Sequence, residues 1–491
     1  MTRGDSCNAG VIAAMVLYLA LAGVMAFTKR PWADEAWFAS MSVNILENGK
    51  TGISVLDPRG NANMLGREFP RIDEVYCVWT PLQQTVYAGW YRVMGFHLLT
   101  MRAFSMLWGL AALFSWFFIL RCLTGDRFTG ALACVLIGTD FAFVDAASDG
   151  RMDMMCAALA FGAMAGYLLL RERRLGWAIA ASQALGVAAG LTHPMGAVGF
   201  LATLALIFRL DFRRLGWRHL GIAAAVYAAG VVAAAAYVLP NLELFRIQLG
   251  VAAAGRVTVA QGNILVREIT EKYRNFYLPP NAGGVALLRV LIPVIYALGL
   301  IGSLAVRSAL PLVTALSLLV MASLDNGKLY YYLVHSTPYL AATLAVAGAA
   351  WAKRGGLARA AACAAVVVLC GLQLSWVAAT ARKDAYHNSF LPMAKFVRGE
   401  IQRGGPRPAL VMASAELGFV LGFLKSTLRD DALLGFQSGW RPDIVVMEER
   451  SYGSHYEGFQ RHRPEVAAHI RRLLEQFRLV YNDGYYKVYA R

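Results

Sequence analysis

Apolar runs long enough to cross a lipid bilayer recur along most of this chain of 491 residues. A membrane-spanning helix needs about 20 mostly apolar residues, and we count about eleven such runs. They cover residues 10–28, 104–120, 128–147, 154–170, 175–191, 194–208, 221–239, 285–306, 308–324, 329–350 and 360–380. Only 16% of the residues are charged, whereas soluble domains carry about 25%. The sequence therefore predicts an all-α polytopic membrane protein, whose first run is a retained anchor rather than a cleaved signal peptide.

Lysines and arginines gather in the short loops on one side of the predicted spans. Such loops are cytoplasmic in most membrane proteins, which places the N-terminus in the cytoplasm and the chain in the cytoplasmic (inner) membrane. The two long polar loops, 29–103 and 240–284, and the C-terminal region then lie on the periplasmic or extracellular side. This topology accounts for the net charge of +16, so we expect the lipid bilayer, and no nucleic acid, as a partner.

The C-terminal region, 381–491, reads as a small α/β extracytoplasmic domain beside a transmembrane domain of residues 1–380. Helical spacing covers 391–403 and 466–477, and short apolar segments at 409–412 and 444–447 read as strands. The sequence Asn482-Asp483-Gly484 predicts a hairpin turn near the C-terminus. We find no catalytic motif there, which favours a packing or acceptor-docking role. The seven cysteines show no metal or disulfide spacing.

Two adjacent carboxylates, Asp34 and Glu35, follow the first predicted span. A carboxylate next to an apolar helix is costly unless it is neutralised or has a function. One hypothesis is a general base that takes a proton from a hydroxyl group. The alternative is a helix start, where acidic side chains complement the helix dipole. Trp32 and Trp37 flank the pair, as expected at a membrane interface.

A second charged group lies at the external junction of the third and fourth predicted spans, in Ser148-Asp-Gly-Arg-Met-Asp-Met154. Asp149, Arg151 and Asp153 are candidates for binding a phosphate, a sugar or a cation. The alternative is a capped helix start with a local ion pair. Hard metal ions need several oxygen ligands, and the sequence does not show a full set. We therefore predict no certain cofactor, with a divalent cation as a possibility.

Three further external positions are candidates for binding a substrate. Lys328 lies at the start of the tenth predicted span, and Tyr331 follows it. This pair could bind a lipid phosphate, with the ammonium at the phosphate and the aromatic ring at the apolar chain. The alternative is a snorkelling lysine beside an aromatic belt. His193 lies in the turn Leu191-Thr-His-Pro-Met-Gly196 and is equally consistent with a phosphate contact or a capped turn. The loop 240–284 carries Arg256 and Arg274, which suggest an anionic ligand or a solvated helix face.

The order of these motifs along one face resembles the GT-C glycosyltransferases of the protein O-mannosyltransferase and lipid A aminoarabinose transferase branch. The resemblance covers about residues 10–350. It implies an external cavity above the spans, a polyprenyl-phosphate sugar as donor, and inversion at the anomeric carbon.

The resemblance also implies roles for particular residues. It implies that Asp34 is the catalytic aspartate, with Glu35 as its acidic neighbour. Asp149 and Arg151 match a second-loop acidic and basic pair, and Lys328 matches a lysine near the donor phosphate. His193 departs from the family pattern, because many relatives have lysine there.

The predicted function is therefore an inverting transfer of a sugar to an acceptor hydroxyl on the extracytoplasmic face. A phosphodiester-linked sugar carries its own leaving group, so the enzyme needs cations at the phosphate and one base for the acceptor. Two alternatives remain: a transporter or flippase for a lipid-linked or anionic solute, and a scaffold that presents the C-terminal domain. The first favours repeated halves, and we find no repeat. The sequence does not specify the sugar or whether the acceptor is a lipid, glycan or protein of the envelope.

Overall fold

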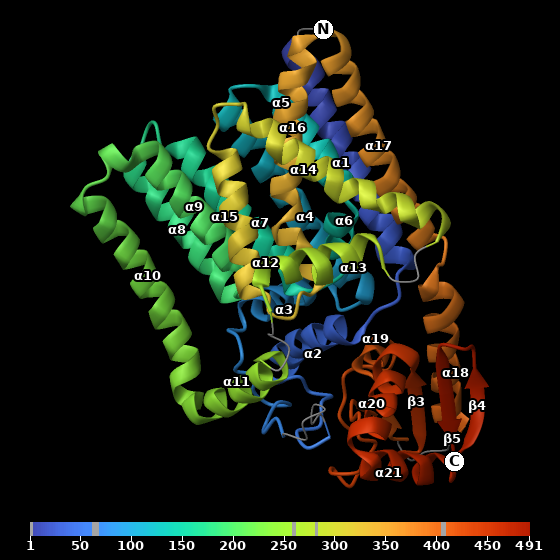
Figure 1. Cartoon of the computed structure of the whole chain (residues 1–491). Coiled ribbons are helices and arrows are strands. Elements are labelled where there is room, and N and C mark those ends of the chain that lie inside the picture. Colours follow the sequence, from blue (N-terminus) through green and yellow to red (C-terminus); the bar gives the residue numbers. More distant parts are fainter. Residues whose placement is uncertain (1–2, 61–67, 258–261, 280–282, 404–408) are drawn as a thin grey trace.

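A bundle of helices makes up most of the computed structural model, and one small sheet lies near its C-terminal end (Figure 1). The structure describes residues 3–60, 68–257, 262–279, 283–403 and 409–491.

Seven helices of the described chain are long and apolar enough to cross a membrane. These seven correspond to α1 (Arg3–Thr28), α4 (Leu98–Thr124), α7 (Met152–Leu170), α8 (Leu175–Thr192), α10 (Trp217–Val238), α14 (Leu291–Leu304) and α17 (Gly356–Ala381). An eighth span results if the bent pair α5 (Arg127–Thr139) and α6 (Phe141–Ala147) counts as one. This confirms a polytopic helical protein.

The predicted number of eleven spans is not confirmed. The other three predicted spans are helical, as α9 (Gly196–Asp211), α15 (Leu310–Leu324) and α16 (Thr337–Arg354), but none is among the seven. α15 has 15 residues, fewer than the roughly 20 that a bilayer core requires. α16 is buried among other helices along most of its length, so its sequence need not be as apolar as a lipid-facing helix.

The bend between α5 and α6 is 68° and centres on Asp140. One carboxylate oxygen accepts from the Phe143 backbone N–H at 3.0 Å and from the Thr337 hydroxyl at 3.1 Å. The other accepts from the Tyr296 hydroxyl at 2.7 Å and the Gln373 amide at 2.8 Å. The sequence predicted a span over 128–147. Asp140 instead caps α6 and connects helices, which explains a buried acid here without a catalytic role.

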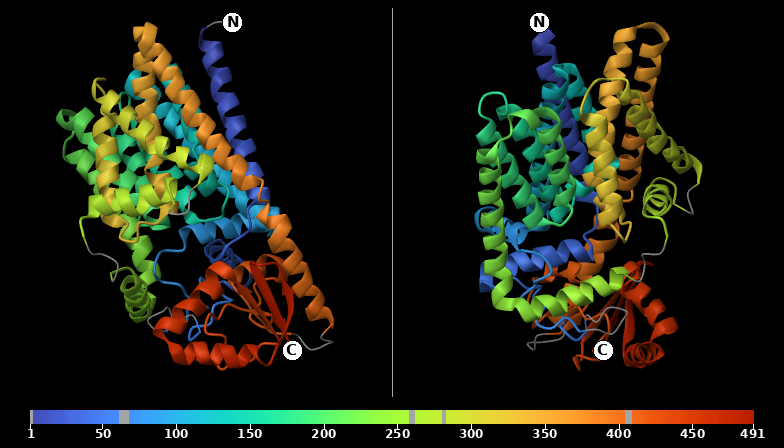
Figure 2. Two further views of the ribbon diagram at one scale, coloured as in Figure 1. Left: turned by 45° about the vertical axis from the view of Figure 1, so that its right-hand side comes forward. Right: turned by 60° about the vertical axis from the view of Figure 1, so that its left-hand side comes forward.

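Shorter helices cover the end of the bundle that faces the C-terminal sheet (Figures 1 and 2). They belong to the two long polar loops: α2 (Ala33–Asn48), α3 (Leu82–Met94), α11 (Leu242–Val257), α12 (Ile264–Arg267) and α13 (Arg274–Tyr277). The N-terminal end of α1 lies at the opposite end of the bundle. The helices of both loops therefore lie at the end of the bundle near the C-terminal sheet. Which side faces the cytoplasm remains a prediction.

The C-terminal unit, by which we mean the elements after α17, contains a five-stranded sheet of order β2-β1-β3-β5-β4. Its elements are α18 (Leu391–Arg403), β1 (Val411–Met412), α19 (Gly418–Leu421), β2 (Leu428–Arg429), β3 (Ile444–Glu448), α20 (Ser454–His462), α21 (Pro464–Leu474), β4 (Arg478–Asn482) and β5 (Tyr486–Ala490). β1 pairs in parallel with β2 and β3, whereas β5 is antiparallel to β3 and β4. The predicted α/β elements are present, and β2 is an addition.

The predicted boundary between the two domains, at residue 380, lies at the end of α17, which ends at Ala381. A turn at residues 382–384 separates α17 from the helical residues that lead into α18. The division into two domains stays a prediction.

Candidate active site

Asp34 and Arg151 form an ion pair at the end of the bundle that faces the C-terminal unit. Asp34 lies in the first turn of α2, where a carboxylate is stabilised by the helix dipole. Arg151 precedes α7, and its Nε donates to the Oδ2 of Asp153 at 2.8 Å. The Asp34 side chain is 27% exposed, but Arg151 is only 4% and Asp153 only 2% exposed. Two carboxylates thus share one buried guanidinium, and Asp34 is the one open to solvent.

Aromatic rings enclose the Arg151 guanidinium. Its Cζ lies 3.9 Å from the ring centre of Tyr331 and 5.0 Å from that of Trp32. Arginine stacks favourably on aromatic faces, because its planar cation is weakly hydrated. The predicted site residues Asp34, Arg151, Asp153 and Tyr331 are therefore brought together by three separate segments of the chain.

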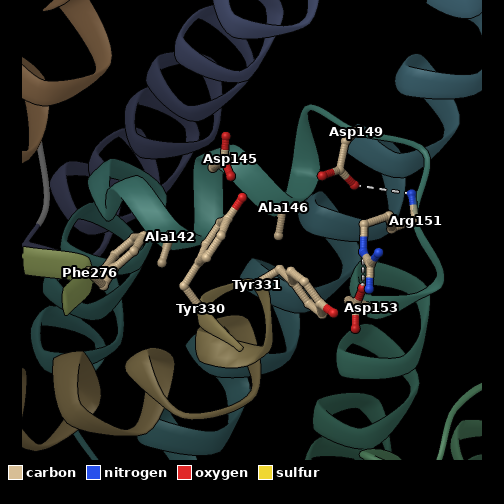
Figure 3. Close-up of a pocket in the computed structure, with 9 residues that line it drawn as sticks. All are labelled: Ala142, Asp145, Ala146, Asp149, Arg151, Asp153, Phe276, Tyr330 and Tyr331. Carbon is tan, nitrogen blue, oxygen red and sulfur yellow. Dashed lines mark hydrogen bonds and ion pairs between the residues drawn. The ribbon is translucent and has the colours of Figure 1, made fainter. Parts of the chain in front are cut away.

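A narrow pocket opens beside this group (Figure 3). Its free volume is about 10 Å³, room for about one water molecule. The lining residues are Ala142, Asp145, Ala146, Asp149, Arg151, Asp153, Phe276, Tyr330 and Tyr331. Carboxylates and aromatic rings around one cation provide hydrogen-bond acceptors and stacking faces, which are the groups that bind sugars and charged headgroups.

Asp149 is held at the rim of the pocket by two neighbours. Its Oδ1 accepts from the Arg151 backbone N–H at 3.1 Å, and its Oδ2 lies 3.5 Å from the Lys29 ammonium. Lys29 also binds Asp145 at 2.8 Å. Burial raises the pKa of Asp149 to about 7, although Lys29 and Arg151 oppose that rise. Asp149 therefore titrates near neutral pH, close to Arg151.

Glu35 points away from the pocket into a fully buried pair with Arg102. Both of its oxygens accept from the guanidinium at 2.8 Å, and the Gly150 N–H donates to one of them at 3.1 Å. The remaining guanidinium nitrogen donates to the backbone oxygens of Ala26 and Lys29, each at 2.7 Å. The pair therefore joins α2 to α4, the end of α1 and the loop before α7.

His193 is placed near Asp153, together with His335. The potential ligand atoms of these three buried residues lie within 4.8 Å of one another, and His335 Nε2 is 3.8 Å from Asp153 Oδ1. This spacing allows a divalent cation. However, His193 Nδ1 accepts from the Met195 N–H at 3.1 Å, which leaves the hydrogen on Nε2. In this arrangement His193 is a donor, so only Asp153 and His335 offer free ligand atoms, and the Arg151 cation is adjacent.

Lys328 lies in a separate cluster of buried charges. Its ammonium is 3.0 Å from Glu268 and donates to the Ala322 carbonyl at 2.6 Å. Lys272 bridges Glu268 at 3.0 Å and Asp325 at 2.9 Å. Lys328 is 5% exposed, and it is not among the residues that line the pocket.

Of the two arginines predicted in the loop 240–284, Arg274 does not join the pocket lining. Arg274 is exposed at the start of α13. Arg256 belongs to α11, but its side chain lies outside the described part of the chain.

Sequence analysis did not identify Lys29 and Arg102 as site residues. Arg102 is a lone charge in the first turns of an apolar helix, and a charge in that position signals a buried partner. The partner, Glu35, is 67 residues away, and no local pattern specifies it.

No family model matches the chain, and no curated protein matches it. Solved structures that match it are GT-C glycosyltransferases, so the chain has the fold of that class.

ArnT from Cupriavidus metallidurans, bound to undecaprenyl phosphate, is 17% identical with a TM-score of 0.54, over 100% of this chain and 98% of that one. The Archaeoglobus fulgidus oligosaccharyltransferase, in complex with Zn and sulfate, is 12% identical with a TM-score of 0.56, over 98% of this chain and 73% of that one. The archaeal oligosaccharyltransferase AglB from Archaeoglobus fulgidus, in complex with an inhibitory peptide and a dolichol-phosphate, is 12% identical with a TM-score of 0.53, over 92% of this chain and 70% of that one. At these identities the likeness establishes the fold alone.

Proposed function

We propose that this protein is a membrane glycosyltransferase that transfers a sugar from a polyprenyl-phosphate donor to an acceptor hydroxyl, with inversion at the anomeric carbon. The observation that carries the proposal is the partly exposed Asp34 carboxylate held by buried Arg151 beside a pocket of acids and aromatic rings. The GT-C fold supports it, because structures of similar fold contain undecaprenyl phosphate or dolichol-phosphate.

In this mechanism Asp34 is the general base. Its carboxylate takes the proton of the acceptor hydroxyl while that oxygen attacks the anomeric carbon. The bond from this carbon to the donor phosphate breaks on the opposite face, and the polyprenyl phosphate leaves with the electron pair. A phosphate needs no strong general acid to leave, so one base is sufficient.

Arg151 has two functions in this proposal. It fixes the Asp34 carboxylate, and its charge favours the phosphate that develops in the transition state. The buried Asp153 and the Tyr331 ring keep the guanidinium in place. Lys29, which is 19% exposed, is a second cation at the pocket. Glu35 anchors α2, so we assign it a positioning role beside the catalytic Asp34.

The spacing of Asp153, His193 and His335 allows a divalent cation, and Asp153 and His335 would hold it. The proposed site faces the extracytoplasmic side of the inner membrane, since Asp34 follows the first span and Arg151 lies at a junction of spans, both predicted to be external. The acceptor is a lipid, glycan or protein of the envelope.

The test uses the purified full chain in lipid nanodiscs, with radiolabelled polyprenyl-phosphate sugars and envelope extracts as acceptors. The wild type should transfer label. Asp34→Asn should lose about 10²–10⁴-fold in rate while polyprenyl phosphate still raises its thermal midpoint. Glu47→Gln is the matched control, because Glu47 is an exposed carboxylate at the other end of α2. Wild-type turnover in Asp34→Asn would remove Asp34 from the mechanism.

A further inference from the structure

The C-terminal unit contacts the helix that carries Asp34. Trp37, one turn after Asp34 on α2, donates from its indole Nε1 to the Oδ2 of Asp430 at 2.9 Å. Asp430 follows β2 and lies 393 residues further along the chain. Residues three apart share one side of a helix, so this bond acts close to Asp34.

Asp430 makes three further contacts, two within the C-terminal unit and one to the loop 29–103. Its Oδ2 also accepts from the Ala415 N–H at 3.1 Å, and its Oδ1 accepts from the Tyr452 hydroxyl at 2.9 Å. Its backbone N–H donates to the Val55 carbonyl at 2.8 Å. Asp430 is 4% exposed. Burying a carboxylate is costly unless its oxygens accept hydrogen bonds. The oxygens of Asp430 accept from two elements of its own unit and from one indole of α2.

Apolar packing surrounds the same bond. The turn Ala415–Leu417, which includes one of the donors to Asp430, packs against α2. Phe38 and Met41 of α2 belong to one buried cluster with Leu417 and Phe423 of the C-terminal unit. The bond therefore lies at the edge of a packed interface that excludes water.

α2 is thus anchored at two points close to Asp34. Glu35 connects it to the bundle through Arg102, and Trp37 connects it to the C-terminal unit. Asp34 lies immediately before the first anchor and three residues before the second. We propose that Trp37 and Asp430 are positioning residues for Asp34, so that the C-terminal unit is a structural part of the reaction centre. This inference rests on the proposed function.

The test compares two indole-to-carboxylate bonds of the same interface. Trp37→Phe removes the donor to Asp430 and keeps an aromatic ring. Trp440→Phe is the matched control, because Trp440 Nε1 donates to Asp57 Oδ2 at 2.8 Å and this bond ends on a loop rather than on α2. We measure kcat and donor KM of each full-length variant in nanodiscs, with hydrogen exchange of the α2 amides as a second readout.

Trp37→Phe should lower kcat at least tenfold with donor KM unchanged, since a misplacement of about 1 Å costs up to about 10²-fold in rate. Its α2 amides should exchange faster than those of Trp440→Phe. Asp430→Ala, which removes the acceptor, should give the same loss, and the double variant should be no slower than the worse single one. Wild-type kcat and exchange in Trp37→Phe, or additive losses in the double variant, would overturn the proposal. If the wild type transfers no sugar but the α2 amides of Trp37→Phe still exchange faster, the anchor is supported and the proposed enzyme function is refuted.

Discussion

Asp34 and Glu35 are adjacent acids, and we assign catalysis to Asp34 and a structural role to Glu35. Replacing Glu35 tests the structural role. In Glu35→Ala the Arg102 guanidinium loses both carboxylate contacts of 2.8 Å and keeps only two backbone carbonyls. Both side chains are 0% exposed, so water cannot replace the partner. Removing one member of a buried ion pair costs about 3–5 kcal/mol, because it leaves an uncompensated charge.

The assay is thermal unfolding of the purified protein in one detergent, followed by tryptophan fluorescence. Glu35→Ala should lower the midpoint clearly, whereas Asp34→Asn should stay near wild type, since Asp34 is partly exposed. The double variant Glu35→Ala with Arg102→Leu should recover much of the loss, because an apolar pair removes the unpaired charge.

Two results would refute this reasoning. A wild-type midpoint in Glu35→Ala would show that the buried pair contributes little to stability. A double variant as unstable as the sum of the two single variants would show that Glu35 and Arg102 act independently.

The remaining predictions concern pH and the two other charged groups. Burial, reinforced by Glu448, raises the pKa of Glu416 from 4.5 to about 8. Between these values the folded chain keeps a proton that the unfolded chain has lost, so the free energy of unfolding should fall as pH rises; Glu416→Gln should flatten this slope in thermal midpoints measured from pH 5 to 8.5. Lys328→Met should cost about 3–5 kcal/mol, measured as a lower midpoint, and Glu268→Gln in the same chain should recover part of it. Arg151→Lys replaces the planar guanidinium with a compact ammonium, so it should lower kcat with little change in thermal midpoint. A kcat equal to that of the wild type would contradict the proposal that Arg151 fixes the Asp34 carboxylate.

The sequence determined the class of structure because hydropathy and local patterns are local properties. Apolar runs located the helices of the bundle, and the pattern around residues 391–403 and the Asn482-Asp483-Gly484 turn located elements of the C-terminal unit. The position of Asp34 after the first apolar run also made it the leading candidate before any contact was known.

Only the tertiary structure decided which charges meet. Asp34 and Arg151 are 117 residues apart, and Trp37 and Asp430 are 393 apart. Asp34 and Glu35 are adjacent in sequence but lie in different environments, because Glu35 is fully buried and Asp34 is partly exposed. Side chains of consecutive helical residues point about 100° apart, and only the packing around α2 determines which direction leads to Arg151 and solvent and which to the core.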